Sequence, residues 1–552
     1  MAQLETHDRG TPDAGVVPDV VELSASTLPL LARRMRVPTY DRSGLTPSVV
    51  HFSVGGFHRA HQLVYLDDLA EQGNTDWGVV GVGLHSPAMR DALQPQDHLY
   101  TVVERGADGE RARVIGSMID YHFAPDSPET VLDVLVDERT RLVTMTVTGN
   151  AYRIDATSGE FAPDGAALAD LADPRRPQSL FGYIVEALDR RRRAGARPFT
   201  VLSCDNMQQN GEAARTAVVG FARLRDEVLA RWIDDNVAFP GSMVDRITPS
   251  TSEADRDRIA ATFGVGDRWP VITEQFSQWV MEDAFCNDRP PLEQVGVQFV
   301  PDVGDHELMK TRLLNASHSA MGHLGQLAGV EQVAEFLADP VFGRYVTRLM
   351  AEEIAPLLPA PAGVDLAGYQ RNLLQRFADP SIGDRLDRLC RRGSSKVPLY
   401  LLPSLVQARA EGRPSTLLTV AVAGFCRYLQ GSDPAGHELV MADDRAAELG
   451  MLARAGGTDP RPLLAVRSVF DDLGDDPAAV DAVAEVLRQF EEHGVRATVA
   501  AAVDQDGAVR HDALSPLSVR RSGDAARRAR AGLTAPARAT AVVASGDRLL
   551  PA

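Results

Sequence analysis

Along the first half of the chain, short runs of apolar positions alternate with amphipathic helical patterns. An apolar run at residues 49–54 (VVHFSV) is interrupted by Gly55 and Gly56, and leucines recur at helical spacing in the following segment, FHRAHQLVYLDDLAEQ. Further apolar runs are typical of buried strands: residues 77–84 (WGVVGVGL), 141–148 (RLVTMTVT) and 199–206 (FTVLSCDN). A helical pattern, SLFGYIVEALDRRRRAG, lies between the last two. This alternation predicts a mainly parallel, doubly wound sheet.

The pattern changes after about residue 304. From there helical periodicity recurs, few β-branched runs occur, and Pro and Gly mark the loops. We therefore predict an α/β protein in which an N-terminal Rossmann-like doubly wound domain is followed by an all-helical C-terminal domain. The expected parts are an N-terminal arm at 1–45, the dinucleotide-binding domain at 46–303, the helical substrate and catalytic domain at 304–510, and a flexible Arg-rich tail at 511–552.

Charge and composition exclude several classes of protein. The 552 residues include 57 Lys and Arg against 76 Asp and Glu, and the resulting net charge of −19 argues against binding to nucleic acid. No window approaches about eighteen uninterrupted apolar residues and the N-terminus is polar, so we expect a cytoplasmic protein without a signal or membrane anchor. The four cysteines form no C-x-x-C pair, which predicts reduced thiols.

Only two of the 57 basic residues are lysines, Lys310 and Lys396. A genome that favours arginine codons explains the excess of arginine. Arginine keeps its proton at physiological pH, whereas burial can lower the pKa of a lysine until its amine acts as a base. Both lysines are therefore candidates for chemistry.

The glycine turn after the first apolar run has the layout of a dinucleotide site, in which a strand leads through a glycine turn into a helix. Its sequence is Ser53, Val54, Gly55, Gly56 and Phe57, so serine stands where the usual fingerprint has its first glycine. By itself the motif also fits an ordinary strand-to-helix turn. No carboxylate occurs in residues 83–90, where an acid would hold the ribose hydroxyls, so the choice between NAD and NADP stays open.

The segment KTRLLNASH carries the strongest cluster of polar groups. At about 100° per residue, Lys310, Asn315 and His318 lie at about 0°, 140° and 80° around a helix. Oxidation of a secondary alcohol needs a base for the hydroxyl proton and donors for the oxygen. An amine, an amide and an imidazole on one helix could supply these groups, and an exposed polar face is the alternative.

Polar residues also follow two predicted strands. Asn206 lies just past a strand, at the sheet edge where α/β proteins bind ligands, although an Asx turn would explain it equally. Asp245 and Arg246 end another strand and predict either a contact to a substrate hydroxyl or a buried ion pair.

Two further groups of basic side chains have competing interpretations. The segment RLDRLCRRGSSKVP could bind a polyol or an acidic substrate, or be a solvated charge run; it brings together Arg388, Arg391, Arg392 and Lys396 beside a Gly-Ser turn. His58 and His61 are spaced as metal ligands could be, but no third ligand is evident. We expect them to pack or cap, and we expect no metal.

Together these segments resemble the polyol-specific long-chain dehydrogenase/reductase family, which includes mannitol dehydrogenases, arabinitol dehydrogenases and hexuronate reductases. The resemblance covers about residues 45 to 500 and rests on these motifs: VGGFHRAHQ, WGVVGVGL, SCDN, FPGSMVDRITP, WPVITEQFSQWVMEDAF, GVQFVPDV, KTRLLNASH and GSSKVP. It implies a Rossmann domain joined to a helical domain, an active site between them, no zinc, and a monomer or weak oligomer.

The resemblance also implies residue roles. Lys310 matches the general base, Asn206 and Asn315 the amides that bind the oxyanion, His318 a substrate-orienting residue and Glu307 a proton-relay carboxylate. The positions that match contacts to substrate hydroxyls are Asp245, Arg388 and Lys396. The expected contacts to the cofactor are Ser53, Val54, Gly55, Gly56, Phe57 and Arg59.

The expected activity is NAD-dependent, zinc-independent oxidation of a linear polyol to a ketose, and the reverse reduction. GVGL and GSSK resemble the mannitol-specific members, which favours D-mannitol and D-fructose over a hexuronate reductase or a D-arabinitol dehydrogenase. The chain departs from the family at Ser53, and at residues 148–152 (TGNAY), where the family has T-E-x-G-Y. A catalytically silent dinucleotide-binding sensor is therefore the alternative from another class.

Overall fold

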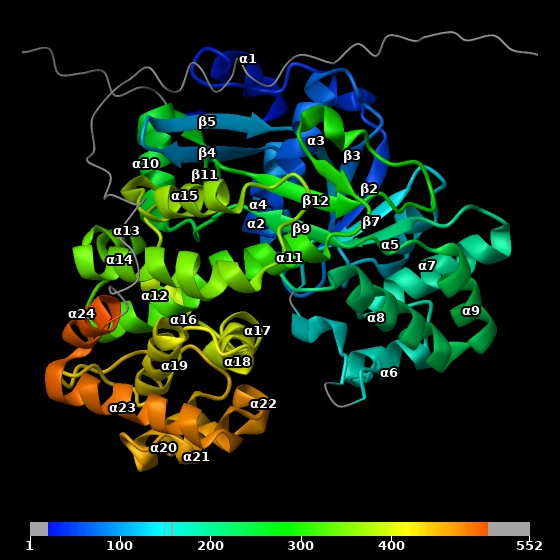
Figure 1. Ribbon diagram of the computed structural model, residues 1–552. Coiled ribbons are helices and arrows are strands. Elements are labelled where there is room, and N and C mark those ends of the chain that lie inside the picture. The colour runs from blue at the N-terminus through cyan, green and yellow to red at the C-terminus, as the bar shows by residue number, and fades with distance from the viewer. Residues whose placement is uncertain (1–19, 148, 156–157, 506–552) are drawn as a thin grey trace, which may run out of the picture. The chain divides into compact units, whose positions relative to one another are not determined.

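The computed structural model describes residues 20–147, 149–155 and 158–505 (Figure 1). The predicted tail at 511–552, the first 19 residues of the predicted arm and Thr148 lie outside these residues. Within the described ranges, no helix combines the length and the apolar character needed to cross a membrane.

A five-stranded parallel sheet forms the centre of the N-terminal half. Its strands are β2 (Pro47–Phe52), β3 (Gly78–Gly83), β6 (Met118–Phe123), β7 (Leu142–Met145) and β8 (Thr200–Ser203). In space they lie in the order β6-β3-β2-β7-β8, and every neighbouring pair is parallel. Numbered along the chain, this order is 3-2-1-4-5, as in Rossmann folds, with the switch point between β2 and β7. The predicted doubly wound sheet is confirmed.

The helices of this half bury apolar residues against the sheets and against one another. They are α2 (Gly56–Ala60), α3 (Gln62–Glu71), α4 (Ala88–Leu93), α5 (Pro128–Val136), α6 (Gly165–Ala172), α7 (Leu180–Ala194), α8 (Asn210–Arg225), α9 (Glu227–Asn236) and α10 (Glu253–Phe263). Helix α7 shows how the sequence sets the ends: Ser179 accepts a hydrogen bond from the Gly182 amide at the start, and Gly195 adopts a left-handed conformation (φ 70°) at the end. Most of α7 is buried between these caps.

Two three-stranded sheets were not predicted. In one, β4 (Tyr100–Gly106) pairs antiparallel with β5 (Gly109–Ile115) and parallel with β11 (Val271–Glu274). In the other, β12 (Gln278–Glu282) lies between β9 (Ser242–Asp245) and β13 (Gln298–Val300). The end of β9 carries Asp245, at the strand terminus where the sequence placed it.

The described part of the predicted N-terminal arm contains regular structure. Strand β1 (Val21–Glu22) pairs with β10 (Val265–Gly266), and the short helix α1 (Leu28–Leu31) follows it. Leu23 and Leu31 are buried in one apolar cluster with residues of β4 and β11. The apolar patch of this segment therefore packs on the β4–β5 layer.

The first strand ends two residues earlier than predicted, because Ser53 adopts a left-handed backbone conformation (φ 68°) and turns the chain out of the sheet. Helix α2 then begins at Gly56, and the helix expected to continue from there breaks at His61 (φ −120°, ψ −86°) before α3. Strands β3, β7 and β8 are likewise shorter than the apolar runs that predicted them.

Every regular element in described residues 304–505 is a helix, which confirms the predicted helical domain. The α-helices are α11 (Gly304–Lys310), α12 (Ala316–Leu327), α13 (Val333–Ala338), α14 (Pro340–Arg348), α15 (Leu366–Phe377), α16 (Leu386–Cys390), α17 (Gly393–Tyr400), α18 (Leu402–Ala410), α19 (Thr416–Tyr428), α20 (Ala446–Gly456), α21 (Arg461–Leu464), α22 (Arg467–Phe470), α23 (Pro477–His493) and α24 (Val495–Gln505). Helix α19 is buried along its whole length and packs against α12 and α23.

A π-helical turn, Thr311–Asn315, connects α11 to α12. The amide of Ala316 donates to the carbonyl of Thr311, five residues earlier. The sequence predicted a continuous α-helix here, so the predicted angle of about 140° between Lys310 and Asn315 was wrong. In a π-turn, residues five apart lie about one turn above each other, and such turns are frequent at functional sites.

Candidate active site

Three polar side chains meet at the loop that follows β8: Asn206 of the loop, Lys310 at the end of α11 and Asn315 at the end of the π-turn. The Nζ of Lys310 donates a hydrogen bond to Oδ1 of Asn206, and Nδ2 of Asn315 donates to the same oxygen at 3.4 Å. Lys310 and Asn315 are buried, whereas Asn206 is exposed. Lys310, Asn206 and Glu307 line a common pocket. The π-turn explains this convergence, because it brings Asn315 to the same side as Lys310.

Burial determines the protonation of Lys310. It lowers the pKa of the amine to about 8, with Asp245 and Glu307 acting to raise the pKa and Arg376 acting to lower it. At this pKa the neutral form of Lys310 is a minor but substantial fraction near physiological pH, whereas almost none of an ordinary lysine is neutral there. Lys310 can therefore act as a base without a metal ion beside it.

Glu307 lies one turn before Lys310 on α11. Its Oε2 accepts a hydrogen bond from the Gln209 amide at 2.8 Å, and its buried Oε1 has no partner among the described residues. The pKa of Glu307 is raised to about 7. Burial is the main cause, the carboxylates Glu282 and Asp302 act in the same direction, and the Gln209 amide acts in the opposite direction. A carboxylate with this pKa and one unpaired oxygen can exchange a proton with its surroundings.

His318 follows on α12, with its ring 4.6 Å from the ring of Phe377. Its buried Nε2 has no partner in the described part of the chain. Burial holds the pKa of His318 well below its usual range, and Arg388, Arg376, Lys396 and Lys310 lower it further. The ring is therefore neutral and can hydrogen-bond a substrate hydroxyl.

Arg388 and Lys396 lie in electrostatic range of His318, but each already has a partner in the protein. Arg388 forms a bidentate ion pair with Asp384, with distances of 2.7 Å (Nε to Oδ1) and 2.6 Å (Nη2 to Oδ2). Lys396 donates to the carbonyl of Leu389 at 3.2 Å. Burial, helped by Arg388, lowers the pKa of Lys396 to about 8. Their roles toward substrate stay predictions.

Asp245 is in a buried ion pair, which was one of the two alternatives for this residue. Its carboxylate accepts from Arg376 at 2.7 and 3.1 Å, and Arg376 also donates to both oxygens of Glu274 at 2.9 and 2.8 Å. All three side chains are buried. The neighbouring Arg246 pairs instead with Glu104. The role of Asp245 as a substrate contact stays a prediction.

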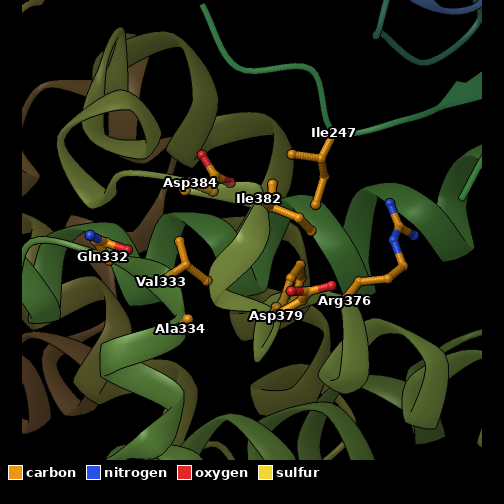
Figure 2. Close-up of a pocket in the computed structure, with 10 residues that line it drawn as sticks. Ile247, Gln332, Val333, Ala334, Arg376, Asp379, Ile382 and Asp384 are labelled. Carbon is orange, nitrogen blue, oxygen red and sulfur yellow. The ribbon is translucent and has the colours of Figure 1, made fainter. Parts of the chain in front are cut away.

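Arg376 is a residue that the sequence did not single out, because nothing local connects it to Asp245, 131 residues away. It joins helix α15 to the ends of β9 and β11. Figure 2 shows it together with Ile247 and Asp384 among the residues that line one pocket. The second carboxylate, Glu274, lies in the motif WPVITEQF, but nothing in that motif indicates that Arg376 is its partner.

The glycine turn lies at the carboxyl end of β2, next to the switch point of the sheet. Methyl groups built on Gly55 and Gly56 would come no closer than 3.9 Å to other protein atoms, and neither glycine has a positive φ. By contrast, a methyl group on Gly83 would lie 2.2 Å from the Tyr121 hydroxyl. Neither packing nor backbone strain therefore explains Gly55 and Gly56, whereas the close approach of a dinucleotide pyrophosphate does. The turn fits the cofactor.

Arg59 differs from the other residues of the turn. Its side chain is buried, its guanidinium lies 5.3 Å from the Tyr100 ring centroid, and it donates to the carbonyl of Trp269. A contact between Arg59 and the cofactor stays a prediction. The contacts of Ser53, Val54 and Phe57 with cofactor also stay predictions.

The two histidines after the turn pack inside the protein, as expected. His58 stacks on His51 with ring centroids 3.3 Å apart, and His61 Nε2 lies 2.8 Å from the Gln278 carbonyl. No cluster of three or more His, Cys, Asp or Glu side chains is arranged to hold a metal ion in the described ranges.

Tyr152 ends the segment that departs from the family pattern. Its hydroxyl donates to Oδ2 of Asp205 at 2.7 Å and lies 2.6 Å from the Ser203 hydroxyl, so the segment is joined to the end of β8 beside Asn206. Thr148, at the other end of the segment, lies outside the described residues.

A buried amine with a pKa of about 8 can, in its neutral form, take the hydroxyl proton of an alcohol. The adjacent sheet has the strand order of a dinucleotide-binding fold, and its glycine turn leaves space for a pyrophosphate. Fold and site thus define a dinucleotide-dependent oxidoreductase. Two family profiles match the chain, the mannitol dehydrogenase Rossmann domain at residues 47–294 and the mannitol dehydrogenase C-terminal domain at 302–491. The chain belongs to the mannitol dehydrogenase family.

Individual relatives agree. The mannitol 2-dehydrogenase of Phaeosphaeria nodorum is 45% identical over 493 residues, which cover 88% of this chain and 86% of the relative. The Pseudomonas fluorescens mannitol 2-dehydrogenase, solved as a ternary complex with NAD and D-mannitol, superimposes with a TM-score of 0.82 at 39% identity and covers 88% of this chain and 100% of its own. A substrate-free D-sorbitol dehydrogenase gives a TM-score of 0.79 at 36% identity, over 86% of this chain and 100% of its own.

A methyl group on Gly55 tests the cofactor turn. Gly55→Ala should leave the thermal unfolding temperature unchanged, because the methyl group meets no protein atom closer than 3.9 Å. It should raise the Kd for NADH by about tenfold or more, because it occupies space that a pyrophosphate needs. Titration of NADH fluorescence measures this. Gly165→Ala, which also meets open space but lies in α6, is the control. An unchanged Kd in Gly55→Ala would rule out the turn as the cofactor site.

The pH profile tests the charges around Lys310. The base must be neutral for oxidation, so kcat/KM for polyol oxidation should rise with pH and level off above about 8, while ketose reduction should fall over the same range. Asp245→Asn removes an anion that raises the pKa of Lys310, so its midpoint should move to lower pH by about one unit. Asp384→Asn, whose carboxylate pairs with Arg388 instead, should keep the midpoint near 8. A shift of the Asp245→Asn midpoint to higher pH would contradict the assignment.

Proposed function

We propose that this chain oxidises D-mannitol to D-fructose with NAD and catalyses the reverse reduction, with Lys310 as the general base. The single observation that carries the mechanism is the buried Lys310 amine, with a pKa of about 8, hydrogen-bonded to Asn206 at the carboxyl end of a dinucleotide-binding sheet. The substrate and cofactor are supported by the family membership and by the relative solved with NAD and D-mannitol.

The hydrogen bond of Lys310 to Asn206 leaves the amine able to accept the hydroxyl proton of the substrate. A neutral amine has two N–H groups and one lone pair. With one N–H donated to Asn206, the lone pair remains for the hydroxyl proton of the substrate. As the alcohol oxygen becomes a carbonyl, the amides of Asn206 and Asn315 are close enough to each other to donate to one oxygen. NAD, when bound, supplies the hydride acceptor.

Glu307 receives the proton after the chemical step. Its unpaired Oε1 lies on the same helix one turn from Lys310, and its pKa of about 7 is close to that of the amine. Transfer between groups of similar pKa costs little free energy in either direction. Glu307 can therefore reset Lys310 for the next oxidation and reprotonate it for reduction.

The basic side chains near His318 suit a substrate with many hydroxyl groups. Asp384 pairs with Arg388 and offsets the charge of its guanidinium. Burial lowers the pKa of Lys396 to about 8, so most of this amine is still protonated near neutral pH. The preference for a neutral polyol over a hexuronate therefore rests on the relatives and not on the charge of these groups. The same groups, with the neutral His318 ring, can still donate hydrogen bonds to hydroxyls.

D-sorbitol is the second candidate substrate, because the D-sorbitol dehydrogenase structure superimposes almost as well as the mannitol enzyme. The two polyols differ in the configuration of one carbon, so hydroxyl contacts must discriminate between them. A monomer or weak oligomer in the cytoplasm stays a prediction.

A substrate panel with one variant tests the function. D-mannitol, D-sorbitol and D-arabinitol with NAD and NADP, and D-fructose and fructuronate with NADH, are assayed by nicotinamide absorbance; we expect D-mannitol with NAD to give the highest kcat/KM. Lys310→Ala should lower kcat by about a thousandfold or more and keep the Kd for NADH within about twofold, because the base is lost and the turn is intact. Lys396→Ala is the matched control and should chiefly raise KM. Near wild-type kcat in Lys310→Ala would rule out this mechanism, and no turnover of any polyol by a chain that binds NADH would favour a sensor.

A further inference from the structure

The cofactor turn begins with a strained residue. Ser53 has φ 68°, a left-handed conformation that is unfavourable for a residue with a side chain and that glycine adopts almost freely. In the usual dinucleotide fingerprint a glycine occupies this place. Something else in this chain must therefore hold Ser53 in the conformation that turns the strand toward the helix.

Hydrogen bonds to both neighbouring strands fix the backbone of Ser53. Its amide donates to the Val82 carbonyl in β3 at 2.9 Å, and its carbonyl accepts from the Thr146 hydroxyl at 3.0 Å. The first is an ordinary sheet contact. The second comes from Thr146, which lies just past the end of β7. Strand β7 pairs with β2 across the switch point of the sheet, so the glycine turn is anchored to the strand on that side.

The Thr146 hydroxyl is itself held by a buried imidazole. His51 Nε2 lies 3.1 Å from the Thr146 hydroxyl, and His51 Nδ1 lies 2.7 Å from the Thr144 hydroxyl. Because Thr146 gives its proton to Ser53, it must accept one from Nε2, and Nδ1 must then accept from Thr144. Burial, which lowers the pKa of His51 to about 3, keeps the ring neutral as this pattern requires. The chain of hydrogen bonds therefore has one direction, from Thr144 through His51 and Thr146 to Ser53.

The same imidazole contacts the other side of the turn. His58, in helix α2, stacks on His51 with ring planes 3° from parallel and centroids 3.3 Å apart. His58 stands five residues after Ser53, where the usual fingerprint has its third glycine for close packing of helix on strand. The His51 ring thus contacts Thr146, which holds Ser53 before the two glycines, and His58, which follows them.

We propose that Thr146, with its hydroxyl oriented by His51, is a positioning residue that keeps the cofactor turn preformed by holding Ser53 in its left-handed conformation. This inference rests on the proposed assignment of residues 53–57 to the cofactor. Because the turn is already ordered, cofactor binding does not have to order it. The contact should therefore increase the affinity for the cofactor and leave the rate of the chemical step unchanged.

Removing one hydroxyl tests the proposal. Thr146→Val should raise the Kd for NADH by about five- to tenfold, with kcat at saturating NAD within about twofold of wild type. Thr146→Ser, which keeps the hydroxyl, should retain wild-type affinity. Thr144→Val removes a hydroxyl from the other side of the same imidazole without breaking the contact to Ser53, and should change the Kd by less than about twofold.

Rescue separates this proposal from a general loss of stability. Adding Ser53→Gly to Thr146→Val should restore the Kd for NADH to within about twofold of wild type, because glycine adopts the left-handed conformation without an anchor. An unchanged Kd in Thr146→Val, or no rescue by Ser53→Gly, would overturn the proposal. If the wild-type chain itself fails to bind NADH, the proposed function fails first, so the two failures are distinguishable.

Discussion

The hydrogen bond from Lys310 to Asn206 is the contact on which the site depends. It joins the helix that opens the C-terminal helical region to the loop at the carboxyl end of the parallel sheet. Asn315 reaches the same oxygen only because the helix widens to a π-turn between the two residues. Burial in this junction removes water from the amine and lowers its pKa to about 8. The π-turn, the burial of Lys310 and its lowered pKa therefore all depend on how α11 packs against the loop after β8.

A second buried contact supports the first. Arg376 binds Asp245 and Glu274 together, and it fixes the ends of two strands against helix α15. Leaving either carboxylate buried without this partner would be costly, since breaking a buried ion pair costs about 3–5 kcal/mol. The triad also holds Asp245, whose charge opposes the burial effect on Lys310, at a fixed position. Stability and the protonation of the base therefore depend on the same ion pairs.

Much of the fold and the main site residues could be predicted from local sequence. The strand, turn and helix around Gly55 and the polar cluster after Lys310 are each contained in a few residues, so periodicity and residue type suffice. The Arg376 triad could not be predicted, because its members come from three elements that only the tertiary fold brings together. The π-turn was missed because its apolar spacing matches that of an α-helix over so short a segment. The early packing of Leu31 and the left-handed Ser53 also depend on tertiary contacts.

The two lysines allow a direct measurement of the central claim, that Lys310 is a buried base with a lowered pKa. Lys396→Arg leaves Lys310 as the one lysine in the chain, and Lys396 is not among the charges that act on Lys310. Carbon-13 labelling of lysine Cε then gives a single resonance whose chemical shift follows the protonation of Nζ. A titration midpoint near 8 is the expected result. A midpoint near 10.5, the ordinary value for lysine, would contradict it.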